Sequence, residues 1–138
     1  MANYCCAIRT NYFKVKNEEQ FRAIIEKTEA EDDIKVWEVK DSDGNKRFGF
    51  GLYGSIFGLT EYGHETVYDI FIQSLQNCVA DDDAILIFES GNEKLRYVIG
   101  IATVITFNKV EYLDMEDIAC RKAAELLNNA KWETQCSY

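Results

Sequence analysis

Apolar residues dominate two extended runs of the chain, residues 84–88 and 95–106. Ser90-Gly91-Asn92 lies between them and leaves room only for a hairpin turn. In the second run both alternating sets of side chains are apolar, which predicts a strand with little water on either face and a central place in a sheet. We expect the rest of the chain to cover or extend this hairpin.

The remaining pattern predicts further strands at 4–10, 34–39 and 47–52, the last two joined by a turn at Gly44-Asn45. Helices are predicted at 18–28, capped by Asn17, from about 65 to 79, and after Asp114. The order β-α-β-β-α-β-β-α indicates one α+β domain over residues 1–138, built on a mainly antiparallel five-stranded sheet. An internal αββ duplication and independent convergence on similar caps and turns both remain open.

The second and third helices carry apolar residues at the same offsets of 0, 3, 4, 8, 11 and 12, which predicts a buried stripe on each. The two stripes are Val67, Ile70, Phe71, Leu75, Cys78, Val79 and Met115, Ile118, Ala119, Ala123, Leu126, Leu127. Tyr68 and Ile72 add apolar area outside the first stripe, so that helix is expected to be covered on two sides, by the glycine-rich stretch or by a partner protein.

Five glycines punctuate residues 48–63. Gly49, Gly51 and Gly54 have the spacing of a dinucleotide fingerprint, but that motif needs a strand, a tight turn and then a helix. Here the glycines fall within a predicted strand and no helix opens after them. The composition therefore favours bulges and aromatic side chains lying on bare backbone.

The net charge of −9 argues against direct binding of nucleic acid and favours a basic protein partner. No apolar run is long enough to cross a membrane and the N-terminus lacks the pattern of a signal peptide, so we expect a cytoplasmic protein. Five cysteines without regular spacing and a single histidine predict free thiols, no metal site and no cofactor.

Catalytic signatures are weak. His64 has no nucleophile motif near it and reads as an exposed loop residue, so we expect no enzyme activity and no catalytic residues. If the two helix-hairpin units are related by a pseudo-twofold axis, their acidic ends meet on one rim of the sheet and form a strong negative field. The residues predicted to bind a partner are this rim and nearby aromatic anchors: Asp32, Asp33, Asp81, Asp82, Asp83, Glu61, Glu65, Tyr53, Phe57 and Tyr62.

Residues 2–13, the Phe48-Gly49-Phe50-Gly51 run with Tyr53-Gly54, and residues 91–98 together resemble a family of small acidic proteins carried on mobile elements of Gram-positive bacteria. The resemblance spans essentially the whole chain and brings no assigned catalytic residues. It implies a setting in which acidic proteins inhibit host defence, CRISPR effectors included, by occupying nucleic-acid-binding surfaces.

We therefore predict a non-enzymatic acidic binding protein, an anti-CRISPR-like inhibitor of a bacterial defence nuclease that acts through its negatively charged surface. Two alternatives stay open. One is a small-ligand module or enzyme that uses the Gly49–Gly63 loop and His64. The other is a structural homodimer joined through an exposed sheet face or through the second helix.

Overall fold

The computed structural model describes residues 4–60 and 66–136. Its elements, in chain order, are β1 Cys5–Thr10, α1 Glu18–Lys27, β2 Glu29–Ala30, β3 Lys35–Lys40, β4 Lys46–Tyr53, β5 Ile56–Thr60, β6 Thr66–Val67, α2 Tyr68–Cys78, β7 Ile85–Glu93, β8 Tyr97–Ile105, β9 Val110–Asp114 and α3 Met115–Leu126. The predicted α+β class is confirmed.

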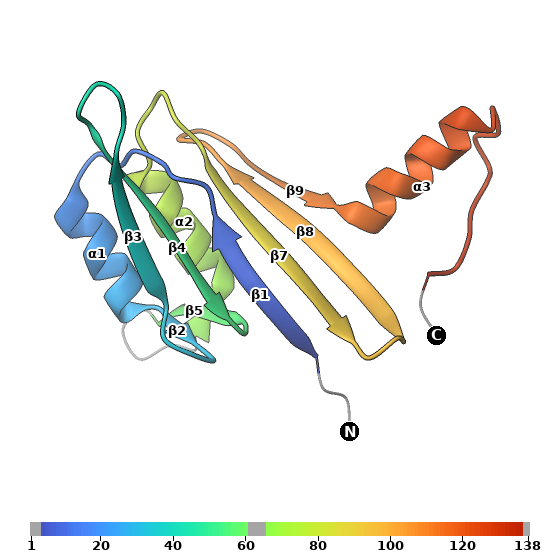
Figure 1. The fold of residues 1–138 in the computed structure, drawn as a ribbon, viewed down its shortest axis with the longest axis horizontal. Coiled ribbons are helices and arrows are strands. Elements are labelled where there is room, and N and C mark those ends of the chain that lie inside the picture. The colour runs from blue at the N-terminus through green and yellow to red at the C-terminus, as the bar shows by residue number, and fades with distance from the viewer. Residues whose placement is uncertain (1–3, 61–65, 137–138) are drawn as a thin grey trace.

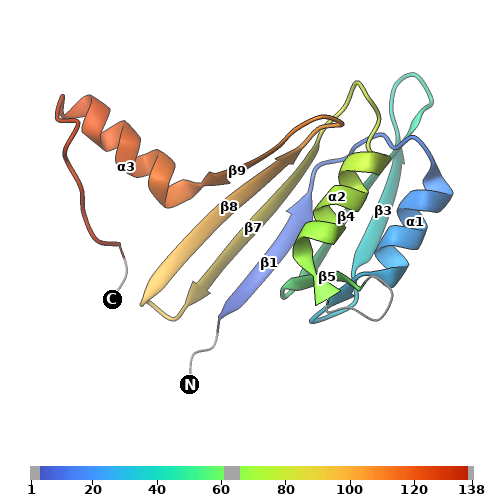
Figure 2. The ribbon, with the colours of Figure 1, turned by 180° about the vertical axis from the view of Figure 1, so that it is seen from behind.

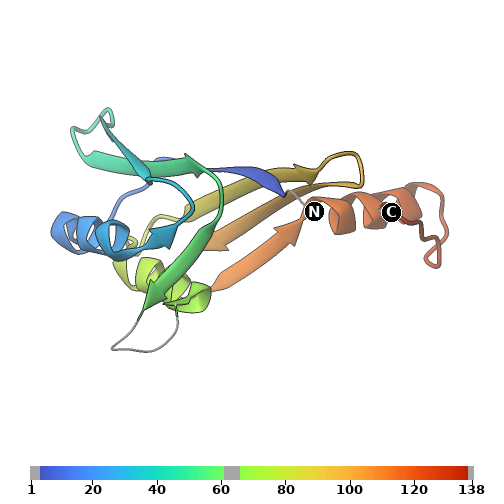
Figure 3. The ribbon, with the colours of Figure 1, turned by 90° about the horizontal axis from the view of Figure 1, so that it is seen from below.

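The main sheet has six antiparallel strands in the order β3-β4-β1-β7-β8-β9 (Figure 1). Within it, β1, α1, β3, β4, α2 and β7 form a β-α-β-β-α-β unit of the split β-α-β type. Helices α1 and α2 cover one face of β3, β4 and β1 (Figures 2 and 3). We call the opposite face, which no helix covers, the open face. A small sheet in the order β2-β5-β6 lies on the helix side.

The prediction of five strands in the main sheet is wrong, because β9 adds a sixth along β8. The position of the second hairpin turn is also wrong. Ser90, Gly91 and Asn92 lie inside β7 and pair with β8, and the turn falls at residues 94–96, where Lys94 has a φ of 51°. Gly91 is needed within the strand because the Tyr4 ring rests on it, in the space that a Cβ would fill.

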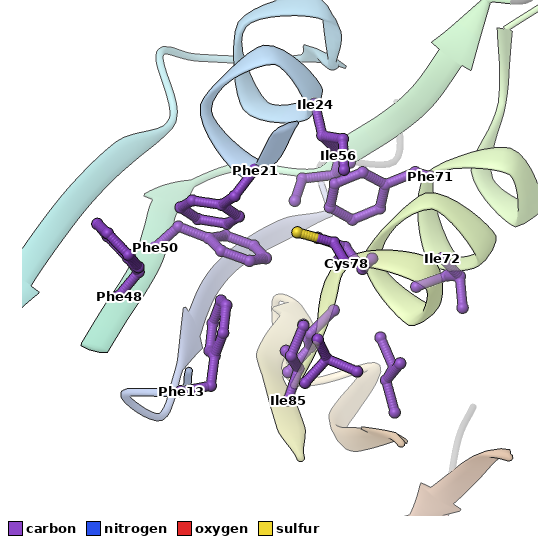
Figure 4. Packing of buried hydrophobic residues seen from close by; sticks show 14 of the residues in the cluster. Phe13, Phe21, Ile24, Phe48, Phe50, Ile56, Phe71, Ile72, Cys78 and Ile85 are labelled. Carbon is purple, nitrogen blue, oxygen red and sulfur yellow. The ribbon is translucent and has the colours of Figure 1, made fainter. Parts of the chain in front are cut away.

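The core lies between α1, α2 and the sheet and is built from phenylalanine rings (Figure 4). Phe13 meets Phe21 edge-on with ring centroids 5.5 Å apart, and Phe50 meets Phe71 at 6.1 Å. Below them, the buried hydroxyl of Thr10 accepts a hydrogen bond from the Phe50 backbone at 2.9 Å. These contacts fix β1 against β4 and hold both helices on the same side of the sheet.

The first helix begins as predicted, since the Asn17 side chain accepts a 3.0 Å hydrogen bond from the Gln20 backbone. Helix α2 begins at Tyr68 rather than at residue 65 or 66, because Thr66 and Val67 pair with β5. The backbone of β5 passes directly over this point, at Gly58, whose missing side chain leaves room for Val67 and Tyr68. Part of the glycine-rich stretch therefore covers α2, as the first of the two alternatives predicts.

Helix α3 differs from its prediction. Asp114 caps it as expected, with a 2.9 Å hydrogen bond from the Glu116 backbone. None of its residues is buried, however, and the helix extends away from the sheet (Figure 1). The prediction that its apolar stripe is buried is wrong within this chain. Strand β8 is likewise more exposed than predicted, since Val98 is 57% exposed.

Candidate ligand-binding face

The acidic residues predicted to form one rim lie at opposite ends of the sheet. Asp32 and Asp33 precede Lys35, which pairs with Gly51 near the end of β4, whereas Asp83 lies 3.3 Å from Arg47 at the start of β4. The two places are four positions apart along β4, which is about 13 Å and exceeds the Debye length of about 8 Å at physiological salt. Figure 1 shows β2 at the lower end of the strands and the loop between α2 and β7 at their upper end.

Moreover, ion pairs with basic residues neutralise the second acidic cluster, residues 81–83. Asp81 pairs with Lys16 at 3.1 Å, Asp82 with Lys14 at 2.7 Å, and Asp83 with Arg47 at 3.3 Å. The hydrogen bond from Lys14 holds the pKa of the Asp82 carboxyl below its ordinary value. The prediction of a shared acidic rim is wrong. The carboxylates of the second cluster form ion pairs that hold the loop after α2 to β4 and to the segment after β1.

The aromatic anchors do not converge either. Tyr53 lies at the end of β4 and is 77% exposed. Phe57 lies on β5, where it lines a hollow together with Asp32 and Asp33 of the loop between β2 and β3. Glu61, Tyr62, His64 and Glu65 lie outside the described residues.

Instead, the structure brings aromatic and basic side chains together on the open face. Lys35, Gly51 and Arg9 are direct neighbours across β3, β4 and β1. The two glycines of β4 make room for rings: a Cβ on Gly51 would lie 3.3 Å from the Trp37 ring, and one on Gly49 would lie 3.3 Å from the Tyr12 ring. The prediction of aromatic side chains on bare backbone is confirmed at both positions.

Arg9 is held in place by this surface. Its guanidinium carbon lies 4.1 Å from the centroid of the Trp37 ring, within the range of a cation–π interaction. One terminal nitrogen donates to the Tyr12 hydroxyl at 3.1 Å, and Nε donates to the Thr10 carbonyl at 3.3 Å. The other terminal nitrogen, Nη1, has no partner among the residues that the structure describes.

The surface around Arg9 and Lys35 is positively charged, whereas the whole protein has a net charge of −9. Within residues 4–60 and 66–136, neither Arg9 nor Lys35 forms an ion pair with a carboxylate. Both line a hollow of about 340 Å³ whose remaining side-chain walls are Ala7, Trp37 and Tyr53. That volume falls within the range of small-molecule sites. The hollow therefore combines two uncompensated cations with two aromatic rings.

The sequence analysis missed this site, although two signals were present. Arg9 is the one charged residue in the strand Cys5–Thr10, and a lone arginine in such a strand marks a position of interest. Glycines at alternating positions of one strand, Gly49 and Gly51, place both bare positions on the same face. What the pattern did not reveal is that Trp37 and Arg9 lie close together in the sheet, because strand order was unknown.

Other reactive groups are engaged in packing. Tyr4 donates a 2.6 Å hydrogen bond to Glu89, and burial together with this bond raises the pKa of the Tyr4 hydroxyl well above its ordinary value. Burial raises the pKa of the Cys78 thiol to about 11, which keeps it protonated and unreactive. In the described part of the chain, no three His, Cys, Asp or Glu side chains are grouped so as to hold a metal ion. Nor does it contain a helix long and apolar enough to span a membrane.

No family model matches the chain, and no curated protein matches it. Among solved structures, it is similar to LarC2, the C-terminal domain of a cyclometallase involved in the synthesis of the NPN cofactor of lactate racemase, in its apo form. The similarity covers 94% of this chain and 90% of that one, with 9% sequence identity and a TM-score of 0.35. At that level it assigns no activity to this chain. The resemblance to mobile-element proteins stays a prediction.

The predicted function, inhibition of a defence nuclease through an acidic surface, is wrong. Its premise was a concentrated negative field on one rim, and the structure separates the two acidic clusters and pairs the second with Lys14, Lys16 and Arg47.

Proposed function

We propose that the chain is a binding domain that holds one planar, negatively charged small molecule in the hollow on the open face of β3, β4 and β1. The observation that carries the proposal is the pair Arg9 and Lys35, two cations with no carboxylate partner among the described residues of a protein of net charge −9. In such a protein an unpaired pair of cations beside aromatic rings is the natural place for an anion.

The chemistry of the pocket favours a carboxylate or phosphate group joined to a flat ring. A guanidinium that is already fixed by Trp37 and Tyr12 loses little freedom when it binds an anion, and Nη1 is still available as a donor. Tyr53 presents a ring that is 77% exposed and offers a stacking surface beside the anion. Lys35 adds a second positive charge on the same row.

The size of the hollow limits the ligand. A space of about 340 Å³ accommodates one small molecule, whereas a polyanion such as nucleic acid needs an extended basic track. We therefore keep the expectation that nucleic acid is not bound directly.

The proposal can be tested by fluorescence. Trp132→Phe leaves Trp37 as the single tryptophan, so its emission reports on the hollow. We expect saturable changes on titration with AMP or benzoate, and none with their uncharged counterparts adenosine and benzamide. Binding of the anions should weaken as salt rises.

Arg9→Gln should weaken anion binding by about tenfold or more, because a hydrogen bond to a charged group contributes roughly 1.5–3 kcal/mol. Lys46→Gln is the matched control, since Lys46 is a basic residue at the start of β4 that pairs with Glu18, away from the hollow. Equal affinity in Arg9→Gln and in the parent protein, or no saturable response to either anion, would overturn the proposal.

A further inference from the structure

We propose that two copies of this chain associate through one mainly apolar surface, formed by the open face of β7, β8 and β9 together with the exposed stripe of α3. This surface borders the ligand hollow, because Phe88 pairs with Arg9 across β7 and β1, but the inference does not depend on the proposed binding function. It is the part of the molecule that the chain itself leaves uncovered.

The sheet part of this surface follows from the strand register. Phe88 pairs with Ala102, and Ala102 pairs with Leu113, so the three side chains form a row on the open face. Phe88 is 49% exposed and Leu113 is 40% exposed. The solvent-facing side of an antiparallel sheet is normally polar. An apolar row in that place indicates that something covers it.

The helix part continues the same surface. Met115 reaches over β8, since its sulfur lies 3.1 Å from the point where a Cβ on Gly100 would stand, and Gly100 is on the open face. The stripe then runs along α3 through Ile118 and Leu126, which are 47% and 78% exposed. Lys122 lies between them on the same side of the helix and pairs with Glu125. Figure 1 shows α3 leading away from the edge of the sheet at β9.

The C-terminal tail does not cover this stripe. Ala130 and Trp132 of the tail line a hollow together with Cys120 and Ala124 of α3. Positions 120 and 124 lie on the side of the helix opposite Met115 and Leu126 at 100° per residue. The tail therefore packs against the far side of α3 and leaves the apolar stripe accessible.

An isolated helix of this length is marginal in water. Helix α3 has 12 residues, and helices shorter than about 12–15 residues gain most of their stability from packing an apolar face. Within one copy, α3 buries none of its residues. A partner surface would supply the packing that α3 lacks.

The extent and the composition of the surface fit a second copy. Its large apolar side chains are Phe88, Val98, Leu113, Met115, Ile118 and Leu126, each between 40% and 78% exposed. Together they leave roughly 500 Å² of apolar area uncovered, which matches the apolar part of an about 800 Å² half-interface in a homodimer.

A permanent partner is needed, because an apolar patch of several hundred Å² that is free in solution promotes aggregation. A second copy is always present wherever the first is made. A twofold interface also uses the same patch on both chains, so the apolar surface of one copy is buried against the same surface of the other. A heterologous protein would have to be supplied in matching amounts.

The test is the mass in solution of the full chain at about 100 µM, by light scattering after size exclusion. We expect twice the monomer mass of 15.9 kDa. The double variant Ile118→Lys, Leu126→Lys should be monomeric, with dimerisation at least 100-fold weaker. Phe57→Lys is the matched control, because Phe57 is 51% exposed on β5, away from this surface, and it should remain dimeric.

Hydrogen exchange provides a second readout that does not depend on mass. The amides of α3 should be protected in the parent dimer and exchange fast in the double lysine variant, while amides of β1 and β4 stay protected in both. A monomeric parent protein, a double variant that is still dimeric, or equal exchange of α3 in the two proteins would overturn the proposal.

Discussion

Helices α2 and α3 carry apolar residues at identical offsets, yet one is packed into the core and the other stands in solvent. In α2 the side chains of Phe71, Leu75 and Cys78 are fully buried, whereas no residue of α3 is buried. The difference comes from the segment that each helix leads into. Helix α2 leads into β7, which pairs with β1 and holds the helix against the sheet, whereas the described residues after α3 contain no further strand or helix. Periodicity therefore identifies the apolar face of a helix but not the molecule that covers it.

The sharpest way to break this comparison is the same substitution at both stripes. Leu75→Ala removes a fully buried side chain and should lower the free energy of unfolding by about 2–5 kcal/mol. Leu126→Ala removes one that is 78% exposed and should change it by less than about 0.5 kcal/mol in dilute solution. Urea denaturation of the two variants measures both values. Equal losses would show that α3 is packed within the single chain.

Two glycines extend the comparison to the two halves of the sheet. A Cβ on Gly51 would lie 2.6 Å from the Ile8 carbonyl oxygen, so Gly51→Ala should push β4 from β1 and cost about 1–3 kcal/mol. The three atoms nearest to a Cβ on Gly100 all belong to the Met115 side chain and none is closer than 3.1 Å, so Gly100→Ala should cost less than about 1 kcal/mol. Thermal unfolding ranks the pair. A larger loss for Gly100→Ala would mean that β8 is as tightly packed as β1.

Alkaline pH should destabilise the fold through two shielded tyrosines, Tyr68 and Tyr4. Burial raises the pKa of Tyr68 to about 12, and burial with the bond to Glu89 raises that of Tyr4. Below pH 10 both hydroxyls are neutral in the folded and unfolded chain. Between pH 10 and 12 these two hydroxyls ionise in the unfolded chain and stay neutral in the folded chain. The free energy of unfolding therefore falls, by up to about 1.4 kcal/mol per pH unit for Tyr68.

Tyr68→Phe should flatten this decline in a series of urea titrations from pH 9 to 12. Tyr53→Phe, at a position that is 77% exposed, serves as the control and should keep the slope of the parent protein. An unchanged slope in Tyr68→Phe would show that α2 does not shield this hydroxyl from solvent.

The smallest expected difference concerns the helix caps. Asn17→Ala removes the cap of α1, which carries the fully buried Phe21, and should lower stability by about 1 kcal/mol. Asp114→Ala removes the cap of α3 and should lower global stability by less than about 0.5 kcal/mol, because α3 can fray while the core stays folded. Comparison of the two unfolding midpoints settles the order, and the reverse order would contradict the assignment of α3 as an arm.

The local parts of the fold were predictable because they depend on neighbouring residues. The Asn17 cap and the Gly44-Asn45 turn act over a few positions, and both formed as expected. The stripe of α2 formed as well, except at Val67, which lies in β6 and is exposed. The turn predicted at Ser90-Gly91-Asn92 did not form there. Gly91 lies within β7 and makes room for the ring of Tyr4, which is distant in the sequence. The sequence pattern did not reveal strand β9. Val110 and Tyr112 alternate with polar positions, but the strand is mostly exposed and its average hydrophobicity is low.

The candidate site depends on contacts that no local pattern contains. The stacking of Arg9 on Trp37 joins strands that are separated by β4, and the separation of Asp33 from Asp83 depends on which end of β4 each loop meets. Charge composition alone suggested one acidic field. Only the strand order shows that the acids are divided and that the unpaired cations are together.

The place of β1 in the sheet has a consequence for how the chain folds. Its two neighbours are β4 and β7, and Cys6 pairs with Gly91 across most of the chain. A nascent chain therefore releases β1 long before either neighbour has been synthesised, and β1 is paired on both edges only after β7, Ile85–Glu93, has emerged. Such a high contact order predicts slow folding, in the millisecond-to-second range, and a first strand that needs protection on the ribosome.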